Sequence, residues 1–247
     1  MPAAAAEPGG GGSWAMAYLG WTYHQGWLDF KDDRQAVTWG RKAADLGEPL
    51  AQFLLGNCYL EGVGIEQDLE EGVRWLSAAA SAKFAPAQLV LGRLYLSGDR
   101  VAGDPARGFE LLREAAEQGD AQAECEVGQC YYNGRGVAED QRAAFRWFRR
   151  SADQGYASGQ LMMGLAYAEG IGTGRNPGEA VKWFRHAAEQ GLAEAQNQLG
   201  VCYADGKGVP ANRTEALYWY RKAAEQGHQL AQANLNQPLN RLIDWFR

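Results

Sequence analysis

The residues of this 247-residue chain that could take part in catalysis or cofactor binding are cysteines, histidines and the glycines of one loop. The loop at 170–174 reads GIGTG and precedes a predicted helix, whose first backbone N–H groups could hold a phosphate. A dinucleotide-binding loop of this kind follows a strand, whereas this loop follows a predicted helix and recurs at 62–64 and 206–208. We therefore interpret these glycines as turn residues and expect no cofactor.

The four cysteines are typical of core residues rather than of a disulfide or a metal site. Cys58, Cys130 and Cys202 share one position of a 36-residue repeat and lie two repeats apart. Neighbouring helices lie about 8–10 Å apart, so these Cα atoms are beyond the ~7 Å limit for a disulfide. Cys125 and Cys130 lie on one predicted helix but about 140° apart around it. We expect four free thiols.

The three histidines, His24, His186 and His228, lack the spacing of metal ligands and have no evident partners in the sequence. His24 lies on a predicted helix where it could contact a ligand, and plain solvent exposure is the favoured interpretation. A catalytic site needs a nucleophile beside a base, or a ligand cluster. We therefore predict no catalytic residue, no metal ligand and no enzymatic activity.

An arginine recurs near the end of five of the six predicted helices B, the second helix of each repeat described below. Cations there offset the helix dipole, and an acidic residue follows each arginine four positions later, so we favour a structural role. The row consists of Arg41, Arg113, Arg149, Arg185 and Arg221. The alternative is a patch for an anionic partner, densest around Arg142, Arg146, Arg149 and Arg150.

The elements that would position these residues form a repeat of 36 residues. A glycine recurs six times at this interval, preceded by Leu, Val or Met, with a tyrosine three residues later and a second glycine six residues later. The first glycines are Gly20, Gly56, Gly92, Gly128, Gly164 and Gly200. Four positions that align six times exclude chance, and such a period is typical of repeat architectures.

Each repeat contains two predicted helices, which we name helix A and helix B. Helix A carries the leucine, glycine and tyrosine positions and spans about 51–61 in the second repeat. Helix B follows an Asp or Asn, a preferred N-cap, and ends near a glycine suited to a left-handed cap, except that Lys83 stands there in the second repeat. With no strand pattern, the sequence predicts an all-α fold, an α-solenoid of six 36-residue helix-turn-helix repeats.

The repeats define the domain organisation. We expect a flexible Ala/Gly-rich tail at 1–12, six repeats over 13–232 and a short C-terminal capping helix at 233–247. The six repeats are expected at about 13–52, 53–88, 89–124, 125–160, 161–196 and 197–232.

The chain closely resembles the Sel-1-like repeat family, a relative of the tetratricopeptide repeat, over about residues 13–232. The resemblance rests on the unit A-x-x-x-L-G-x-x-Y-x-x-G-x-G-V-x-x-D-x-x-x-A-x-x-W-x-x-x-A-A-x-x-G, from which the loop at 98–101 departs by lacking the second glycine. It implies a curved superhelix of helix pairs and an adaptor or scaffold rather than an enzyme. Cysteine-rich bacterial relatives linked to β-lactam binding carry regularly paired cysteines, which this chain lacks.

The predicted binding surface lies on the side of helix A opposite the leucine, glycine and tyrosine positions. Residues on that side differ from repeat to repeat while the packing positions stay the same, as expected for a binding groove on a repetitive scaffold. The predicted groove residues are Tyr18, Trp21, Gln25, Leu54, Asn57, Glu61, Val90, Arg93, Gln129, Asn133, Met162, Leu165, Glu169, Val201 and Asp205.

Charge indicates the kind of partner. The chain has a net charge of −6 and its helix A segments are acidic, which favours a peptide or helix with basic and apolar residues and argues against nucleic acid. We expect a non-catalytic protein–protein interaction adaptor; the alternative is a solenoid that binds a small molecule or acts as a weak, β-lactam-related hydrolase.

The sequence lacks an apolar run of membrane length and a secretory signal, so we expect a cytoplasmic location.

Overall fold

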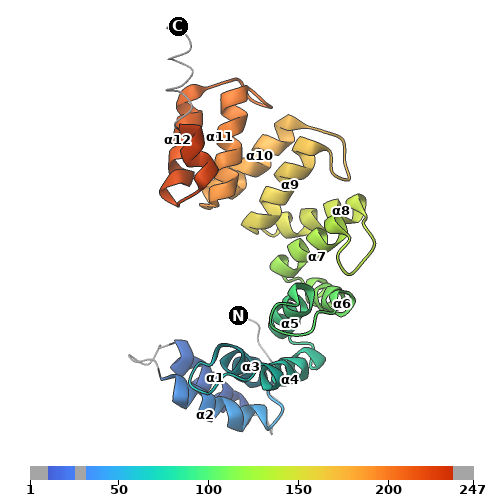
Figure 1. The fold of residues 1–247 in the computed structure, drawn as a ribbon, viewed down its shortest axis with the longest axis vertical. Coiled ribbons are helices and arrows are strands. Elements are labelled where there is room, and N and C mark those ends of the chain that lie inside the picture. The colour runs from blue at the N-terminus through green and yellow to red at the C-terminus, as the bar shows by residue number, and fades with distance from the viewer. Residues whose placement is uncertain (1–10, 26–31, 236–247) are drawn as a thin grey trace. The chain divides into compact units, whose positions relative to one another are not determined.

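The computed structural model describes residues 11–25 and 32–235, and every regular element within these ranges is an α-helix. Two compact units are distinguished, with the boundary between Gln118 and Gly119. Helices A carry odd numbers and helices B carry even numbers in Figure 1. The predicted all-α solenoid of helix pairs is confirmed.

The first unit contains three helix pairs. They are α1 (Gly11–Gln25) with α2 (Asp33–Ala44), α3 (Pro49–Glu61) with α4 (Leu69–Ser81), and α5 (Ala85–Ser97) with α6 (Pro105–Glu117). Each helix A packs on its own helix B, and each helix B packs on the next helix A of the unit. Residues 11 and 12 belong to the first turn of α1 rather than to the predicted tail, and the rest of that tail, 1–10, lies outside the described residues.

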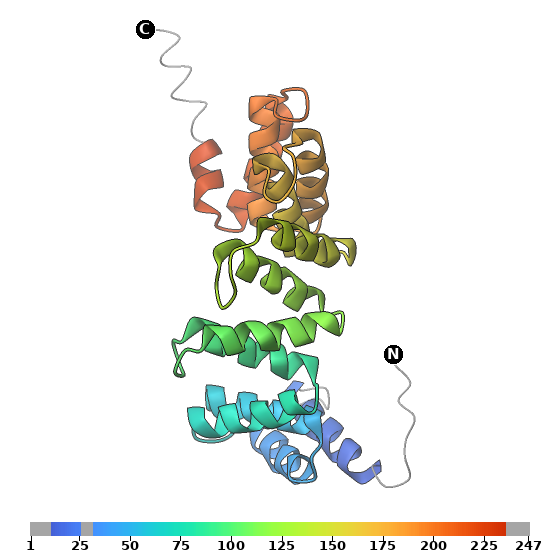
Figure 2. The same cartoon turned by 90° about the vertical axis from the view of Figure 1, so that its right-hand side faces the viewer.

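The second unit also contains three pairs, which Figures 1 and 2 show side by side. They are α7 (Ala121–Asn133) with α8 (Gln141–Asp153), α9 (Ala157–Glu169) with α10 (Pro177–Glu189), and α11 (Ala193–Asp205) with α12 (Arg213–Glu225). Residues 229–235 are helical as well. Of the predicted capping helix at 233–247, residues 236–247 lie outside the described part of the chain.

The predicted N-caps fix where each helix B begins. Asp68 accepts a hydrogen bond from the backbone N–H of Glu71 at 3.0 Å, and Asn176 accepts one from Glu179 at 3.2 Å. All six predicted caps accept such a bond: Asp32, Asp68, Asp104, Asp140, Asn176 and Asn212. Each helix B therefore starts at the same point of its repeat.

The predicted left-handed residues close the helices B. Gly119, Gly155 and Gly191 have φ values of 89°, 85° and 94°. Lys83 stands at the equivalent position of the second repeat and adopts φ 60°, the one positive φ of a non-glycine residue in the described part of the chain. The backbone geometry of the repeat thus overrides the left-handed penalty of a side chain.

The glycine of helix A marks a close contact within a pair. A Cβ at Gly164 would lie 2.4 Å from the ring of Phe184, and one at Gly56 would lie 2.8 Å from Leu76. Phe184 and Leu76 are fully buried. The glycine therefore makes room for the large side chain at one position of helix B, which explains why both recur with the same period.

Candidate functional site

The predicted groove residues lie on helices A of both units, and fourteen of the fifteen are exposed or half-buried. We call them the helix-A surface and treat each unit separately. In the first unit it comprises Tyr18, Trp21, Gln25, Asn57, Glu61, Val90 and Arg93. In the second unit it comprises Gln129, Asn133, Met162, Leu165, Glu169, Val201 and Asp205.

Leu54 was wrongly assigned to this surface. Its side chain is 1% exposed, and its Cδ2 lies within 3.4 Å of where a Cβ of Gly40 would be. The first repeat has Gly40 where later repeats have a bulky residue such as Leu76. Leu54 fills the space that Gly40 leaves, so it contributes to the core instead of to the surface.

Two of the three acidic groups on the helix-A surface are paired within the chain. Glu61 accepts from Arg100 at 2.6 Å, and Asp205 accepts from Lys207 at 2.7 Å. Both pairs are exposed, so each contributes little to stability and can exchange for a partner's cation. Glu169, on α9, has no ion pair among the described residues.

Met162 and Leu165 of the helix-A surface are half-buried. Leu165 packs against the core cluster around Phe184 and Leu199, and Met162 packs against the cluster around Phe148. One side of each side chain faces solvent, while the opposite side packs against the core. This combination holds an apolar contact point rigidly in place.

The cysteines lie in the core, as predicted. Cys58, Cys125, Cys130 and Cys202 are all free and buried. Burial raises the pKa of Cys125 to about 12 and the pKa values of Cys130 and Cys202 to about 11. A thiol kept neutral in this way is a poor nucleophile and a poor metal ligand, and no cluster of metal-ligating side chains exists among the described residues.

The expectation that the histidines lack partners was wrong for two of them. His24 Nδ1 lies 3.2 Å from the carboxylate of Asp33, and His228 Nε2 lies 2.7 Å from Glu194. His228 also accepts from the backbone N–H of Ala231 at 3.2 Å. The carboxylate partners belong to α2 for His24 and to α11 for His228, contacts that the spacing of residues along one helix does not reveal.

Two arginines of the anionic-partner patch on α8 are engaged in ion pairs. Arg149 pairs with Asp153 at 2.9 Å, and Arg150 pairs with the buried Glu124 at 2.8 Å. Arg142 and Arg146 are exposed on the same helix. The pairing favours the structural interpretation of the arginine row over a dedicated anion site.

The sequence reading missed a set of buried glutamine contacts between repeats, which we call the inter-repeat glutamine pairs. In the second unit, Gln196 donates to the carbonyl of Ala188 at 3.1 Å and accepts from Gln226 at 2.9 Å. The same contact joins Gln160 to Gln190 at 2.8 Å. In the first unit, Gln118 donates to Gln88 at 2.6 Å.

One of these contacts uses a carboxylate. Glu124 stands at the position of the buried glutamine, is 1% exposed, and accepts from Gln154 at 2.8 Å and from Arg150 at 2.8 Å. The signal that could have identified the pairs is the recurrence of glutamine every 36 residues just outside the Leu-Gly motif. The sequence did not predict these pairs because a polar residue on helix A is expected to be exposed.

Comparison with known proteins supports this architecture. The Sel1 repeat model matches the chain at 15–48, 49–84, 85–120, 121–156, 157–192 and 193–228. No curated protein matches. No helix among the described residues has the length and apolar character needed to span a membrane.

Similar solved structures include two Sel1-type proteins at 33–34% identity. The c5321 protective antigen of uropathogenic Escherichia coli strains, which displays an SLR fold, is 34% identical with a TM-score of 0.85, covering 94% of this chain and 50% of its own. A Sel1 repeat protein from Oxalobacter formigenes is 33% identical with a TM-score of 0.82, covering 89% and 86%. This chain thus spans half the length of the Escherichia coli protein.

A more distant likeness shows the fold alone. The immunity protein Pa5087 from Pseudomonas aeruginosa is 17% identical with a TM-score of 0.52, covering 86% of this chain and 81% of its own.

The six matched repeats span most of the chain, and their helix pairs, N-caps and close glycine contacts are those of the structure described above. The chain belongs to the Sel1 repeat family.

Proposed function

We propose that this protein is a non-catalytic adaptor that binds a peptide or helical segment of a partner protein on its helix-A surface. Sel1 repeat proteins are generally protein-interaction scaffolds. The observation that carries the proposal for this chain is the exposure of the residues that differ between repeats, beside buried positions that recur. The cytoplasm is the location we propose.

The composition of the surface suggests the chemistry of the partner. Met162, Leu165 and Val201 offer half-buried apolar edges, while Glu169 and Asp205 offer exposed carboxylates. A segment with a few apolar side chains and nearby lysines or arginines would complement both.

The alternative of a hydrolase finds less support, because the raised pKa values of Cys125, Cys130 and Cys202 keep the strongest nucleophilic groups protonated.

The proposal can be tested by selecting peptides from a random displayed library on the full chain. The selection is repeated on a helix-A variant, Glu61→Lys, Glu169→Lys and Asp205→Lys, and on a matched helix-B variant, Glu70→Lys, Glu189→Lys and Glu225→Lys. All six carboxylates are exposed, and both triples raise the formal net charge from −6 by six, to zero. Sequences rich in basic and apolar residues should be enriched by the wild type and the helix-B variant and lost from the helix-A variant.

A further inference from the structure

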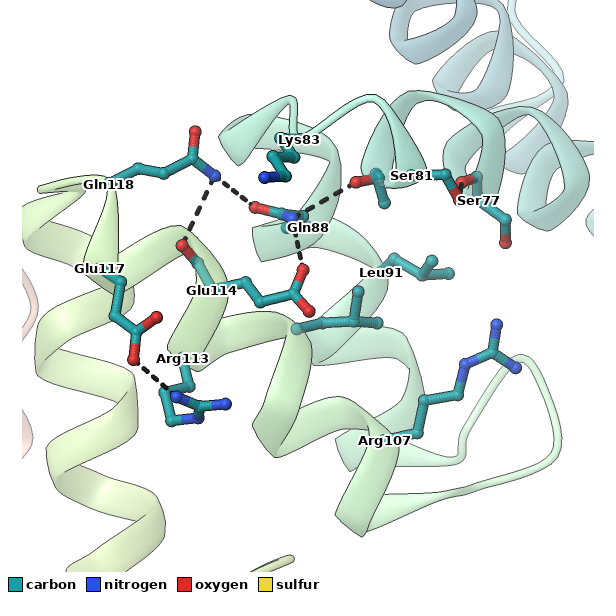
Figure 3. Close-up of a pocket in the computed structure, with 12 residues that line it drawn as sticks. Ser77, Ser81, Lys83, Gln88, Leu91, Arg107, Arg113, Glu114, Glu117 and Gln118 are labelled. Carbon is teal, nitrogen blue, oxygen red and sulfur yellow. Dashed lines mark hydrogen bonds and ion pairs between the residues drawn. The ribbon is translucent and has the colours of Figure 1, made fainter.

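A cavity of about 790 Å³ opens in the first unit between α4 and α6, with α5 at its base. Most of its lining comes from the two helices B, and none of its lining residues belongs to the helix-A surface. Its volume falls in the range of ligand pockets, about 300–1,000 Å³. Figure 3 shows Lys83 and Arg107 at opposite ends of the cavity, with Leu91 between them.

The cavity exists because two long side chains of the repeat are missing at this point. Ser77 stands where other repeats have an arginine, and Leu111 stands where other repeats have a tryptophan. In the second unit, the equivalent positions are occupied by Arg149 and Trp183. The guanidinium of Arg149 lies 5.9 Å from the ring centroid of Trp183. The space between successive helices B is therefore filled by side chains at Arg149 and Trp183 and open at Ser77 and Leu111.

Two further departures from the repeat change the chemistry of the rim. Ser81 replaces the acidic residue found at Glu117 and Asp153, and Lys83 replaces the capping glycine. Four departures from the 36-residue pattern thus border a single cavity: Ser77, Ser81, Lys83 and Leu111. Packing does not require Lys83, because glycine serves this backbone conformation without strain.

The charges that line the cavity leave two cations available. Glu117 accepts from Arg113 at 2.6 Å, whereas Glu114 accepts from the neutral amide of Gln88 at 2.6 Å and keeps its charge. The lining therefore carries three cationic side chains and two carboxylates. Lys83 and Arg107 have no carboxylate partner among the described residues, although Arg107 lies 4.6 Å from the ring centroid of Tyr95. Leu91 and Leu111 add apolar side chains to the lining, and Figure 3 shows Leu91 between Lys83 and Arg107.

We propose that this cavity is a second binding site that takes an acidic and apolar segment of a partner protein. An aromatic or aliphatic side chain occupies the space over Leu91 and Leu111, and flanking carboxylates pair with Lys83 and Arg107. Charge complementarity carries the choice of partner, and the open rim of exposed Lys83 and Arg107 suits a peptide better than a small ligand, which proteins enclose more fully. The site is independent of the helix-A surface and prefers the opposite charge.

The test uses a fluorescein-labelled hexapeptide of alternating glutamate and phenylalanine, with an alternating lysine and phenylalanine hexapeptide as its counterpart. Fluorescence anisotropy should show saturable binding of the acidic peptide to the full chain, weaker binding of the basic one at this site, and loss of affinity with salt. The double variant Ser77→Arg with Leu111→Trp restores the pair seen at Arg149 and Trp183 and should weaken binding on the order of tenfold or more.

A second variant protects the test against misfolding. Lys83→Gly removes one cation and installs the residue that other repeats use, so it should weaken acidic-peptide binding while leaving the thermal midpoint equal or higher. The helix-A variant, which is less negatively charged, should bind the acidic peptide at least as tightly as the wild type does, which separates this site from the proposed function. Equal binding to the wild type and the filled double variant would overturn the proposal, and so would saturation of the cavity by 3-phenylpropionate with no binding of the peptide.

Discussion

Single side chains set how closely the helices of this protein approach. Gly164 and Phe184 recur as a pair because the aromatic ring occupies the volume where any Cβ would lie, 2.4 Å from the nearest ring atom. Lys83 shows the opposite relation, since the backbone at this position is left-handed both with lysine, at φ 60°, and with the equivalent Gly119, at φ 89°. The repeat pattern therefore records steric requirements of single positions, and departures from it mark positions with another role.

Gly164→Ala should lower the free energy of unfolding by about 1–3 kcal/mol, because the added methyl group overpacks a buried contact. Gly178→Ala is the matched control, since its Cβ would meet only Asn176 Oδ1 at 3.5 Å. That control should be neutral or stabilising by about 0.5–1 kcal/mol. Urea unfolding of both variants measures the difference, and equal stabilities would show that the glycine is not required by packing.

The buried thiols should make the protein less stable at alkaline pH. The folded chain holds the Cys125 proton to a pKa of about 12, whereas an unfolded cysteine loses it near 8.5. Between pH 8.5 and 12 the folded state thus binds more protons than the unfolded state. The contribution of this thiol to the free energy of unfolding is complete below pH 8.5 and is lost as pH rises through 12. The pKa of Tyr220, raised to about 12 by burial, acts with the same sign above pH 10.

Urea unfolding at pH 8 and pH 10.5 tests this linkage. The free energy of unfolding of the wild type should fall over the interval, and Cys125→Ala should show a smaller fall because one proton-linked group is gone. If the variant and the wild type lose the same stability between the two pH values, the Cys125 thiol does not carry the effect.

At the scale of elements, sequence pattern predicted most of the fold. The N-cap at Asp68 and the glycine at Gly155 located helix ends, because capping is a local interaction between residues close in sequence. The position of Leu54 was wrong because it depends on Gly40, a contact between two helices. The partners of Gln196 and His228 were missed for the same reason, since Gln226 and Glu194 are 30 and 34 residues away along the chain.

The inter-repeat glutamine pairs should stabilise the contact between neighbouring repeats. A double-mutant cycle with Gln196→Ala and Gln226→Ala should give a coupling of about 1 kcal/mol in urea unfolding, because the loss of Gln226 leaves the buried amide oxygen of Gln196 without its donor. A coupling near zero would show that the pair is incidental.

The second repeat offers a gain-of-contact control for the same idea. Gln52 donates to Ala44 O at 3.3 Å, but Ala82 stands where other repeats have the second glutamine. Ala82→Gln places a donor 30 residues after Gln52, the spacing of Gln196 and Gln226, and should stabilise by about 0.5–1 kcal/mol. A loss of stability in this variant would contradict the proposed geometry of the pair.

At the scale of the whole molecule, repetition separates the residues that build the scaffold from those available for binding. Recurring positions such as Gly200 and Leu199 are buried, whereas positions that differ between repeats, such as Glu169 and Asp205, are exposed. The sequence therefore predicted which of these helix A residues are exposed. It did not predict the cavity at Ser77 and Leu111, because a loss of volume becomes visible only when neighbouring helices B are placed side by side.

The most direct measurement of the central claim is the dissociation constant of one selected basic peptide for three proteins: the wild type, the helix-A variant and the helix-B variant. Since the two variants have equal net charge, any difference between them reports position and not long-range attraction. We predict that the helix-A variant binds at least about tenfold more weakly while the helix-B variant stays within about twofold of the wild type. Equal weakening of both variants, or unchanged binding by the helix-A variant, would contradict the assignment of this surface as the partner-binding site.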